Sequence, residues 1–146
     1  MTMNDEVRLG ELRVGDRLYS GEEVEVTAEE IMAFARDYDP QPGHLSEETA
    51  QGTPFMSLAA SGWHTAALTM RLLVGLGIAG SIGISVSLTW PTPTRPGDRL
   101  HIDGHVTSKR LSESRPDREI LILEYETINQ SGEIRQRTQA VVMTQG

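Results

Sequence analysis

The sequence predicts an α+β fold in which an antiparallel sheet curls around one long buried helix. Residues 59–77 are rich in Ala, Leu and Met, contain no proline, and place apolar side chains on nearly every side of a helix. A helix that is apolar almost all round is typical of a protein core, and this one would be about 25 Å long. Polar residues such as His64 and Arg71 interrupt the run too often for a membrane span.

The second observation is the series of strands that follows the helix. Across residues 82–90, apolar side chains alternate with Gly, Ser and Thr, which is the period of a half-buried strand. Residues 99–106 alternate in the same way, 119–128 form a third strand, and 129–132 make a hairpin turn into a fourth at 133–144. Strands that follow one another without helices between them predict an antiparallel sheet.

The part of the chain before the long helix is predicted to hold short elements. Residues 1–8 are expected to form a flexible N-terminus, which leaves 9–146 as a single domain. Thr27 and Glu30 have the spacing of a capping box, in which each side chain satisfies a free amide at the start of a helix. The expected elements are a strand at 17–26, a helix at 28–36, an irregular loop at 37–45 and a brief helix at 46–51.

Composition limits the partners of the chain. Its 13 basic and 21 acidic residues give a net charge of −8, which makes nucleic acid and anionic membrane surfaces poor partners. It has no cysteine, which excludes disulfides, thiolate metal sites and a thiol nucleophile. The first residues show neither the basic nor the apolar segment of a secretory signal, so we expect a cytoplasmic protein.

Two segments gather polar residues in a way that points to chemistry. In the first, Asp39 and His44 stand five residues apart with two prolines between them to stiffen the backbone. A carboxylate and an imidazole held together can position a water and exchange protons with it near neutral pH. The same residues also fit a simpler interpretation, with a turn at Asp39-Pro40 and a surface or capping role for His44.

In the second segment, Ser61-Gly62-Trp63 begins the long helix. The first amides of a helix have no partner within it and point along a favourable dipole. A glycine there allows a ligand oxygen to approach a backbone N–H, as in an oxyanion hole. The alternative is that Gly62 only allows close packing of a neighbouring strand.

These segments carry a family resemblance. Residues 39–45, Asp-Pro-Gln-Pro-Gly-His-Leu, resemble the Asp-x-Asn-Pro-x-His-Leu motif of MaoC-like dehydratases and (R)-specific enoyl-CoA hydratases. Residues 60–65 resemble the entry of that family into its central helix, and Arg-Pro-Gly-Asp at 95–98 resembles the turn between two of its strands. Gln41 stands where the hydratases usually have Asn, and Ser61 where many have His.

The resemblance implies a single hotdog domain and the reversible addition of water to a trans-2-enoyl thioester, giving an (R)-3-hydroxyacyl thioester. Asp39 and His44 would then hold the water, and the Gly62 N–H would polarise the thioester carbonyl. The resemblance further implies an acyl-CoA substrate, no separate cofactor, and a homodimer or dimer of dimers. Candidates for substrate contacts are Gln41, Phe55, Ser61 and Trp63, together with Arg110 and Arg115, which could meet the phosphates of coenzyme A. A solvated loop explains the two arginines equally well.

Other interpretations stay open at this point. A hotdog thioesterase would direct its water at the carbonyl carbon instead of C3, and a non-catalytic acyl-thioester-binding subunit would keep the fold alone. His101, Asp103 and His105 alternate along one strand at a spacing that zinc sites can use, but we expect them on the solvent side and predict no metal. His64 is expected to be a satisfied core histidine.

Overall fold

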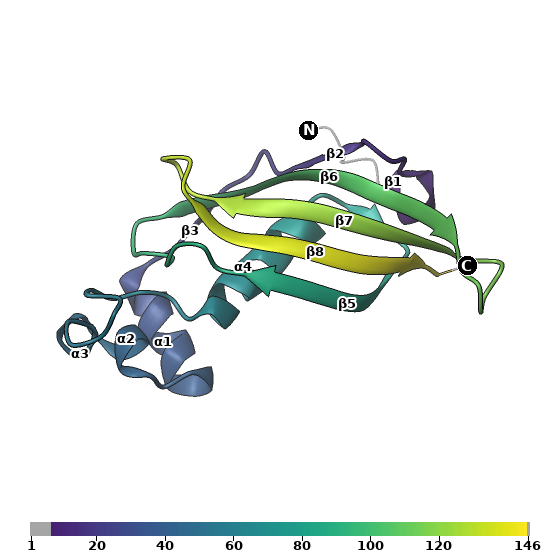
Figure 1. Ribbon diagram of the computed structural model, residues 1–146. Coiled ribbons are helices and arrows are strands. Elements are labelled where there is room, and N and C mark those ends of the chain that lie inside the picture. The colour runs from purple at the N-terminus through teal and green to yellow at the C-terminus, as the bar shows by residue number, and fades with distance from the viewer. Residues whose placement is uncertain (1–6, 146) are drawn as a thin grey trace.

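A computed structural model describes residues 7–145 of the chain. At its centre lies α4 (Gly62–Val74), which runs along one face of a curved sheet (Figure 1). The sheet contains six strands, and every pair of neighbours in it is antiparallel. The α+β class predicted from the sequence is therefore confirmed.

The strand order places the last strands of the chain in the middle of the sheet and β5 at one edge. Its order is β2-β6-β7-β8-β5, and the short β3 pairs with β6 beyond the end of β2. The strands of this sheet are β2 (Arg17–Tyr19), β3 (Val24–Glu25), β5 (Ser81–Thr89), β6 (Arg99–Leu111), β7 (Glu119–Ile128) and β8 (Ile134–Thr144). A separate parallel pair joins β1 (Val7–Arg8) to β4 (Ile78–Ala79).

Two strand predictions need correction, and the prediction for the N-terminus needs restriction. The predicted strand at 17–26 is two short strands, β2 and β3, because the chain leaves the sheet at residues 20–23. Strand β6 continues to Leu111, five residues beyond the predicted end. The expected flexible N-terminus lies largely outside the described residues, but Val7 and Arg8 pair with β4.

The short helices gather at the end of the molecule where α4 begins (Figure 1). The loop expected at 37–45 is partly helical, because α1 extends to Tyr38 and Pro42 occupies the first turn of a further helix, a position that suits its fixed backbone angle. The helices at this end are α1 (Ala28–Tyr38), α2 (Pro42–Leu45) and α3 (Glu47–Ala50). The short 3-10 helix η1 (Leu9–Glu11) is not among them, because it follows β1 directly and contacts β8.

Helix α4 contacts the sheet through one side only. Leu68 and Leu72 belong to the apolar core, and the Thr69 hydroxyl bonds the Thr127 hydroxyl of β7 at 2.6 Å. Its other side is exposed in the single chain, with Met70 at 54% and Val74 at 68%. The prediction of a helix wrapped on all sides is therefore wrong for one chain. None of the described helices has the length and hydropathy that crossing a membrane requires.

Candidate active site

The segment that carries Asp39 and His44 is built by the end of α1 and the whole of α2. Asp39 ends α1, and its backbone N–H donates to the Ala35 carbonyl at 2.9 Å. Pro40 forces the residue before it out of the helical region, so the chain turns sharply there. Helix α2 then places His44 inside the protein, where 5% of the residue is exposed.

The geometry of the imidazole fixes where its hydrogen lies. His44 Nδ1 is 2.7 Å from the Ala59 carbonyl oxygen, which can only accept, so Nδ1 carries the hydrogen and donates it. In the neutral ring, Nε2 then holds the lone pair, and it lies 3.6 Å from Oδ2 of Asp39. The pair therefore presents a basic nitrogen beside a carboxylate.

The Asp39 carboxylate is held in its charged form. Burial raises its pKa, but hydrogen bonds from the Ser61 and Gln41 side chains and the nearby His44 outweigh that effect, so the pKa lies below its usual value of 3.8. Asp39 is consequently ionised at neutral pH and can accept hydrogen bonds from a water or a substrate.

The start of α4 lies directly beside this pair. Ser61 is fully buried, and its hydroxyl oxygen caps the helix by accepting from the Trp63 N–H at 3.2 Å. Within residues 7–145, no acceptor is found for the preceding amide, that of Gly62. A Cβ at residue 62 would lie 2.7 Å from the indole of Trp90, so only glycine fits under that ring.

His44 and Gly62 line the same cavity of about 300 Å³, which falls at the lower end of the range for small-molecule sites. Phe55 and Trp90 form two aromatic walls, and Thr65 and Arg135 also reach the lining. Asp39 contacts His44 but is not among the lining residues. The cavity thus offers an unpaired amide next to a buried imidazole, a combination suited to polarising a carbonyl near a proton-transfer group.

The structure brings some predicted substrate-contact residues to this site but not others. Gln41 and Ser61 bond Asp39, the Phe55 ring lies 5.3 Å from that of His44, and Trp63 meets Trp90 edge-on at 5.6 Å. Arg110 lies at the end of β6 and Arg115 in the loop between β6 and β7. That end of the sheet lies opposite α2 (Figure 1). The reason is the length of β6, whose 13 residues span about 40 Å. Within one chain these two arginines do not reach the dyad.

Two of the three alternating residues on β6, His101 and Asp103, make surface contacts. Asp103 forms an ion pair with Arg17 at 2.8 Å, which holds the pKa of that carboxyl below its usual value, and His101 packs edge-on against Tyr19. Among residues 7–145, no group of His, Asp and Glu side chains has the arrangement of a metal site.

Comparison with known proteins decides the family. The model of the family described as "MaoC like domain" matches residues 11–124. The chain belongs to the MaoC-like family. A MaoC-like dehydratase from Rhodospirillum rubrum is 51% identical with a TM-score of 0.87, over 93% of this chain and 94% of that one. The hotdog fold is therefore established for this MaoC-like protein.

Two relatives of this MaoC-like chain carry names that describe activities. An (R)-hydratase from A. caviae involved in PHA biosynthesis is 30% identical with a TM-score of 0.72, over 90% of this chain and 96% of that one. A 3-hydroxybutyryl-CoA dehydratase from Methylorubrum extorquens is 35% identical over 80 residues, which is 53% of this chain and 51% of that protein.

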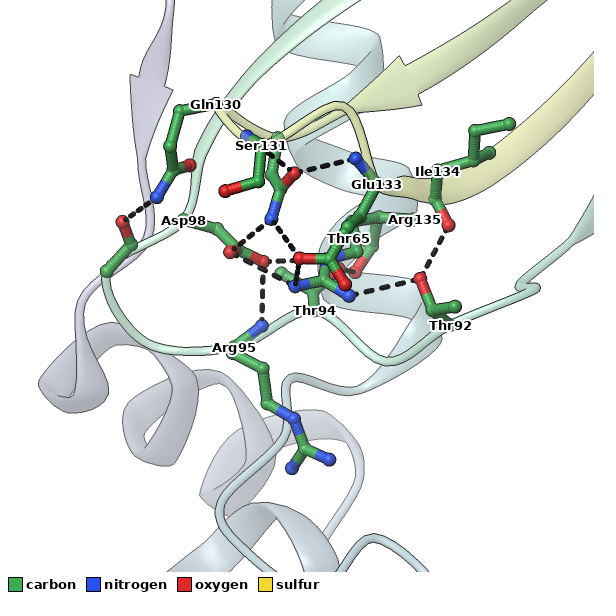
Figure 2. A network of polar contacts seen from close by, with 12 residues as sticks. Thr65, Thr92, Thr94, Arg95, Asp98, Gln130, Ser131, Glu133, Ile134 and Arg135 are labelled. Carbon is green, nitrogen blue, oxygen red and sulfur yellow. Dashed lines mark hydrogen bonds and ion pairs between the residues drawn. The ribbon is translucent and has the colours of Figure 1, made fainter.

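Sequence reasoning missed several residues around the site of this MaoC-like protein. Trp90 was assigned only to a strand, although it covers Gly62 and donates from Nε1 to the Gln136 side chain at 2.9 Å. Arg135 lines the cavity from β8 and bonds Asp98, 37 residues away (Figure 2). Pro91, directly after Trp90, marks the end of a strand in the sequence, but no local pattern marks Arg135 as a cavity residue.

His64 is not the satisfied core histidine that was expected. It is 6% exposed, its ring stacks on Phe34 at 4.8 Å, and its Nδ1 is buried with no hydrogen-bond partner among the described residues. Burial lowers the pKa of His64 below 6.5, although the charge of Glu30 raises it in part. The folded protein therefore favours the neutral ring.

This burial predicts acid sensitivity of the MaoC-like fold. Because the folded pKa lies below the unfolded value of 6.5, the contribution of neutral His64 is complete above pH 6.5 and is lost as the pH falls toward the folded pKa. We expect His64→Leu to flatten the fall in unfolding free energy between pH 7 and 5, measured by urea denaturation, while exposed His105→Asn leaves it unchanged. Equal slopes for His64→Leu and wild type would contradict this assignment.

Proposed function

We propose that this chain is a hydratase/dehydratase that adds water to a trans-2-enoyl thioester, giving an (R)-3-hydroxyacyl thioester. The observation that carries this proposal is the placement of His44 Nε2 within 3.6 Å of Asp39, with an unpaired Gly62 amide on the cavity that His44 lines. The names of the (R)-hydratase and the 3-hydroxybutyryl-CoA dehydratase support the same reaction class.

In this proposal Asp39, His44 and Gly62 each have a different role in hydration. Ionised Asp39 accepts a hydrogen bond from the attacking water and orients it, and the free Nε2 of His44 takes one proton from that water while the other hydrogen stays on the oxygen. As the water oxygen bonds C3, the C2=C3 electrons move toward the thioester carbonyl, whose developing charge the Gly62 N–H stabilises. The proton held on Nε2 then passes to C2, so the dyad ends in its starting state. Dehydration runs through the same steps in reverse.

We propose coenzyme A as the carrier of the acyl group. The net charge of −8 disfavours docking of an acidic carrier protein, whereas a small thioester needs only the local site. The dehydratase relative from Methylorubrum extorquens bears a CoA thioester in its name, which supports the same choice.

The deciding experiment follows the loss of enoyl absorbance with crotonyl-CoA and a longer enoyl-CoA, while free thiol is measured in parallel. We expect absorbance to fall without thiol release, and the product to be the (R)-alcohol by chiral chromatography. Thiol release would instead identify a thioesterase. Absence of both, for a protein shown to be folded, would count against the reaction and favour a non-catalytic binding subunit.

We further propose that two copies of the chain pair through β5 and the exposed side of α4. β5 lies at the edge of the sheet, and its Ile84 and Val86 are 51% and 59% exposed. Met70 and Val74 of α4 face the same apolar cavity, of about 460 Å³, as those two residues. An apolar edge strand beside an apolar helix stripe is suited to a two-fold partner that continues the sheet.

Placing charge on this surface is expected to separate the copies. Met70→Glu and Ile84→Asp should each shift the mass by light scattering from twice 16.1 kDa toward 16.1 kDa at micromolar concentration, because a buried unpaired carboxylate is costly. Val14→Asp is the matched control, because Val14 is 61% exposed and outside this surface. A mass that both substitutions leave at the wild-type value would contradict the proposed interface.

A further inference from the structure

We propose that Arg95 is a positioning residue for His44. Its guanidinium holds the backbone of residues 55–59, and that segment in turn fixes the ring and the tautomer of the imidazole. The kinetic consequence rests on the proposed hydratase function, whereas the effect on the tautomer can be measured without it.

The contacts of Arg95 are concentrated on one short stretch of backbone. Nη1 donates to the Ser57 carbonyl at 2.9 Å, the Ser57 hydroxyl at 2.8 Å and the Leu58 carbonyl at 3.3 Å. Nη2 donates to the Phe55 carbonyl at 2.8 Å. These carbonyls belong to no helix or strand, so they need donors from elsewhere, and the planar fork of an arginine can serve several at once.

The segment needs such a clamp because it contains a strained residue. Met56 has a φ of +67°, a left-handed conformation that is unfavourable for a residue other than glycine. Its side chain is 75% exposed and therefore provides little packing to hold that conformation. The bonds from Arg95 go to the residues immediately before and after Met56, so they stabilise the turn from both sides.

The same segment touches His44 at two places. The Ala59 carbonyl accepts from Nδ1 at 2.7 Å, and the Phe55 ring packs 5.3 Å from the imidazole. Ala59 also donates its N–H to the Gly43 carbonyl at 3.0 Å, which ties the segment to the residue before His44. Movement of residues 55–59 would therefore release Nδ1 and let the ring turn or change tautomer.

Arg95 is itself anchored at its backbone. Its N–H donates to Asp98 Oδ2 at 2.9 Å, and Asp98 belongs to a buried cluster with Arg135 and Asn129. Figure 2 shows the Arg95 side chain leaving this cluster and pointing away from it. The fixed turn thus provides a rigid base from which the guanidinium reaches the segment beside His44.

The direct test is ¹⁵N NMR of the imidazole nitrogens in wild type, Arg95→Lys and Arg95→Met. The chain has four histidines, so the His44 signals can be assigned with His44→Gln. We expect wild type to show hydrogen on Nδ1 alone and both variants to show a mixture of tautomers. Arg99→Met is the control, because Arg99 is an exposed arginine whose side chain, within residues 7–145, pairs with Glu23 at 3.7 Å and does not contact residues 55–59. An unchanged tautomer in folded Arg95→Met would overturn the proposal.

The second readout is kinetic. We expect Arg95→Met to lower kcat for hydration about 10- to 100-fold with little change in KM, and to shift the apparent pKa of the pH–rate profile. In Arg95→Ala, added ethylguanidinium should restore part of the lost kcat. Reduced stability alone would lower the amount of active enzyme without moving the pH profile. An inactive wild type would defeat the hydratase proposal but leave the NMR test valid, whereas an active wild type and an unaltered variant profile would defeat the positioning role.

Discussion

Replacing Asp39 with Asn or His44 with Gln is expected to lower kcat/KM for enoyl-thioester hydration by about 10²–10⁴-fold, the usual range for a group in general acid–base catalysis. Asp39→Asn keeps the shape of the side chain but loses the charge that orients the water. His44→Gln keeps an amide donor for the Ala59 carbonyl but loses the basic Nε2. The measurement is the initial rate of loss of enoyl absorbance with crotonyl-CoA for wild type and each variant.

The double variant tests whether the two residues act together. Groups that share one water should not contribute independently, so Asp39→Asn with His44→Gln should cost about as much as the worse single change. Asp37→Asn provides the control, because Asp37 is an exposed carboxylate two residues before Asp39. Losses that multiply in the double variant, or single variants with wild-type rates, would show that the pair is not a catalytic unit.

The pH dependence follows from the state of the carboxylate. Because the pKa of Asp39 lies below 3.8, it stays ionised well into the acid range and cannot cause a loss of activity near pH 6. The measurement is kcat/KM for hydration as a function of pH, in wild type and in Asp39→Asn. Asp39→Asn should therefore reduce the height of the profile without moving its acid limb.

Local patterns in the sequence predicted most of the fold. β7 has the predicted bounds, because a strand followed by an Asn-Gln-Ser-Gly turn is marked at both ends by neighbouring residues. Asp39 and His44 could be singled out together because only five residues and two prolines separate them. The boundary of β6 was harder to place, since Thr107–Arg110 is polar and shows no alternation.

Long-range contacts could not be predicted in this way. Thr69 meets Thr127 across 58 residues, and Arg95 clamps carbonyls almost 40 residues earlier in the chain. The residues next to Thr69 or Arg95 in the sequence give no indication of which distant residue each one contacts. The exposed side of α4 was missed for a related reason: its apolar stripe looks the same in sequence whether the sheet of the same chain or a second copy covers it.

The second large effect concerns the buried pair that supports the turn before β6. Asp98 and Arg135 are 4% and 5% exposed, and they form two hydrogen bonds of 2.9 and 3.2 Å. Asn129 and the Arg95 N–H complete the coordination of the carboxylate (Figure 2). Arg135→Met should lower the unfolding free energy by about 3–5 kcal/mol in urea denaturation, because it leaves Asp98 charged and buried without its partner.

Two further variants distinguish the destabilisation caused by an unpaired buried charge from the net contribution of the ion pair to the unfolding free energy. Asp98→Leu with Arg135→Met should recover much of the lost stability, since apolar groups can replace a buried ion pair. Arg137→Met, which breaks the exposed pair with Glu126 at 3.0 Å, should change stability by about 1 kcal/mol or less. The double variant also removes the acceptor for the Arg95 N–H, so it should regain stability yet keep a disturbed His44 tautomer. Recovery of both would mean that the Asp98–Arg135 pair serves the fold alone.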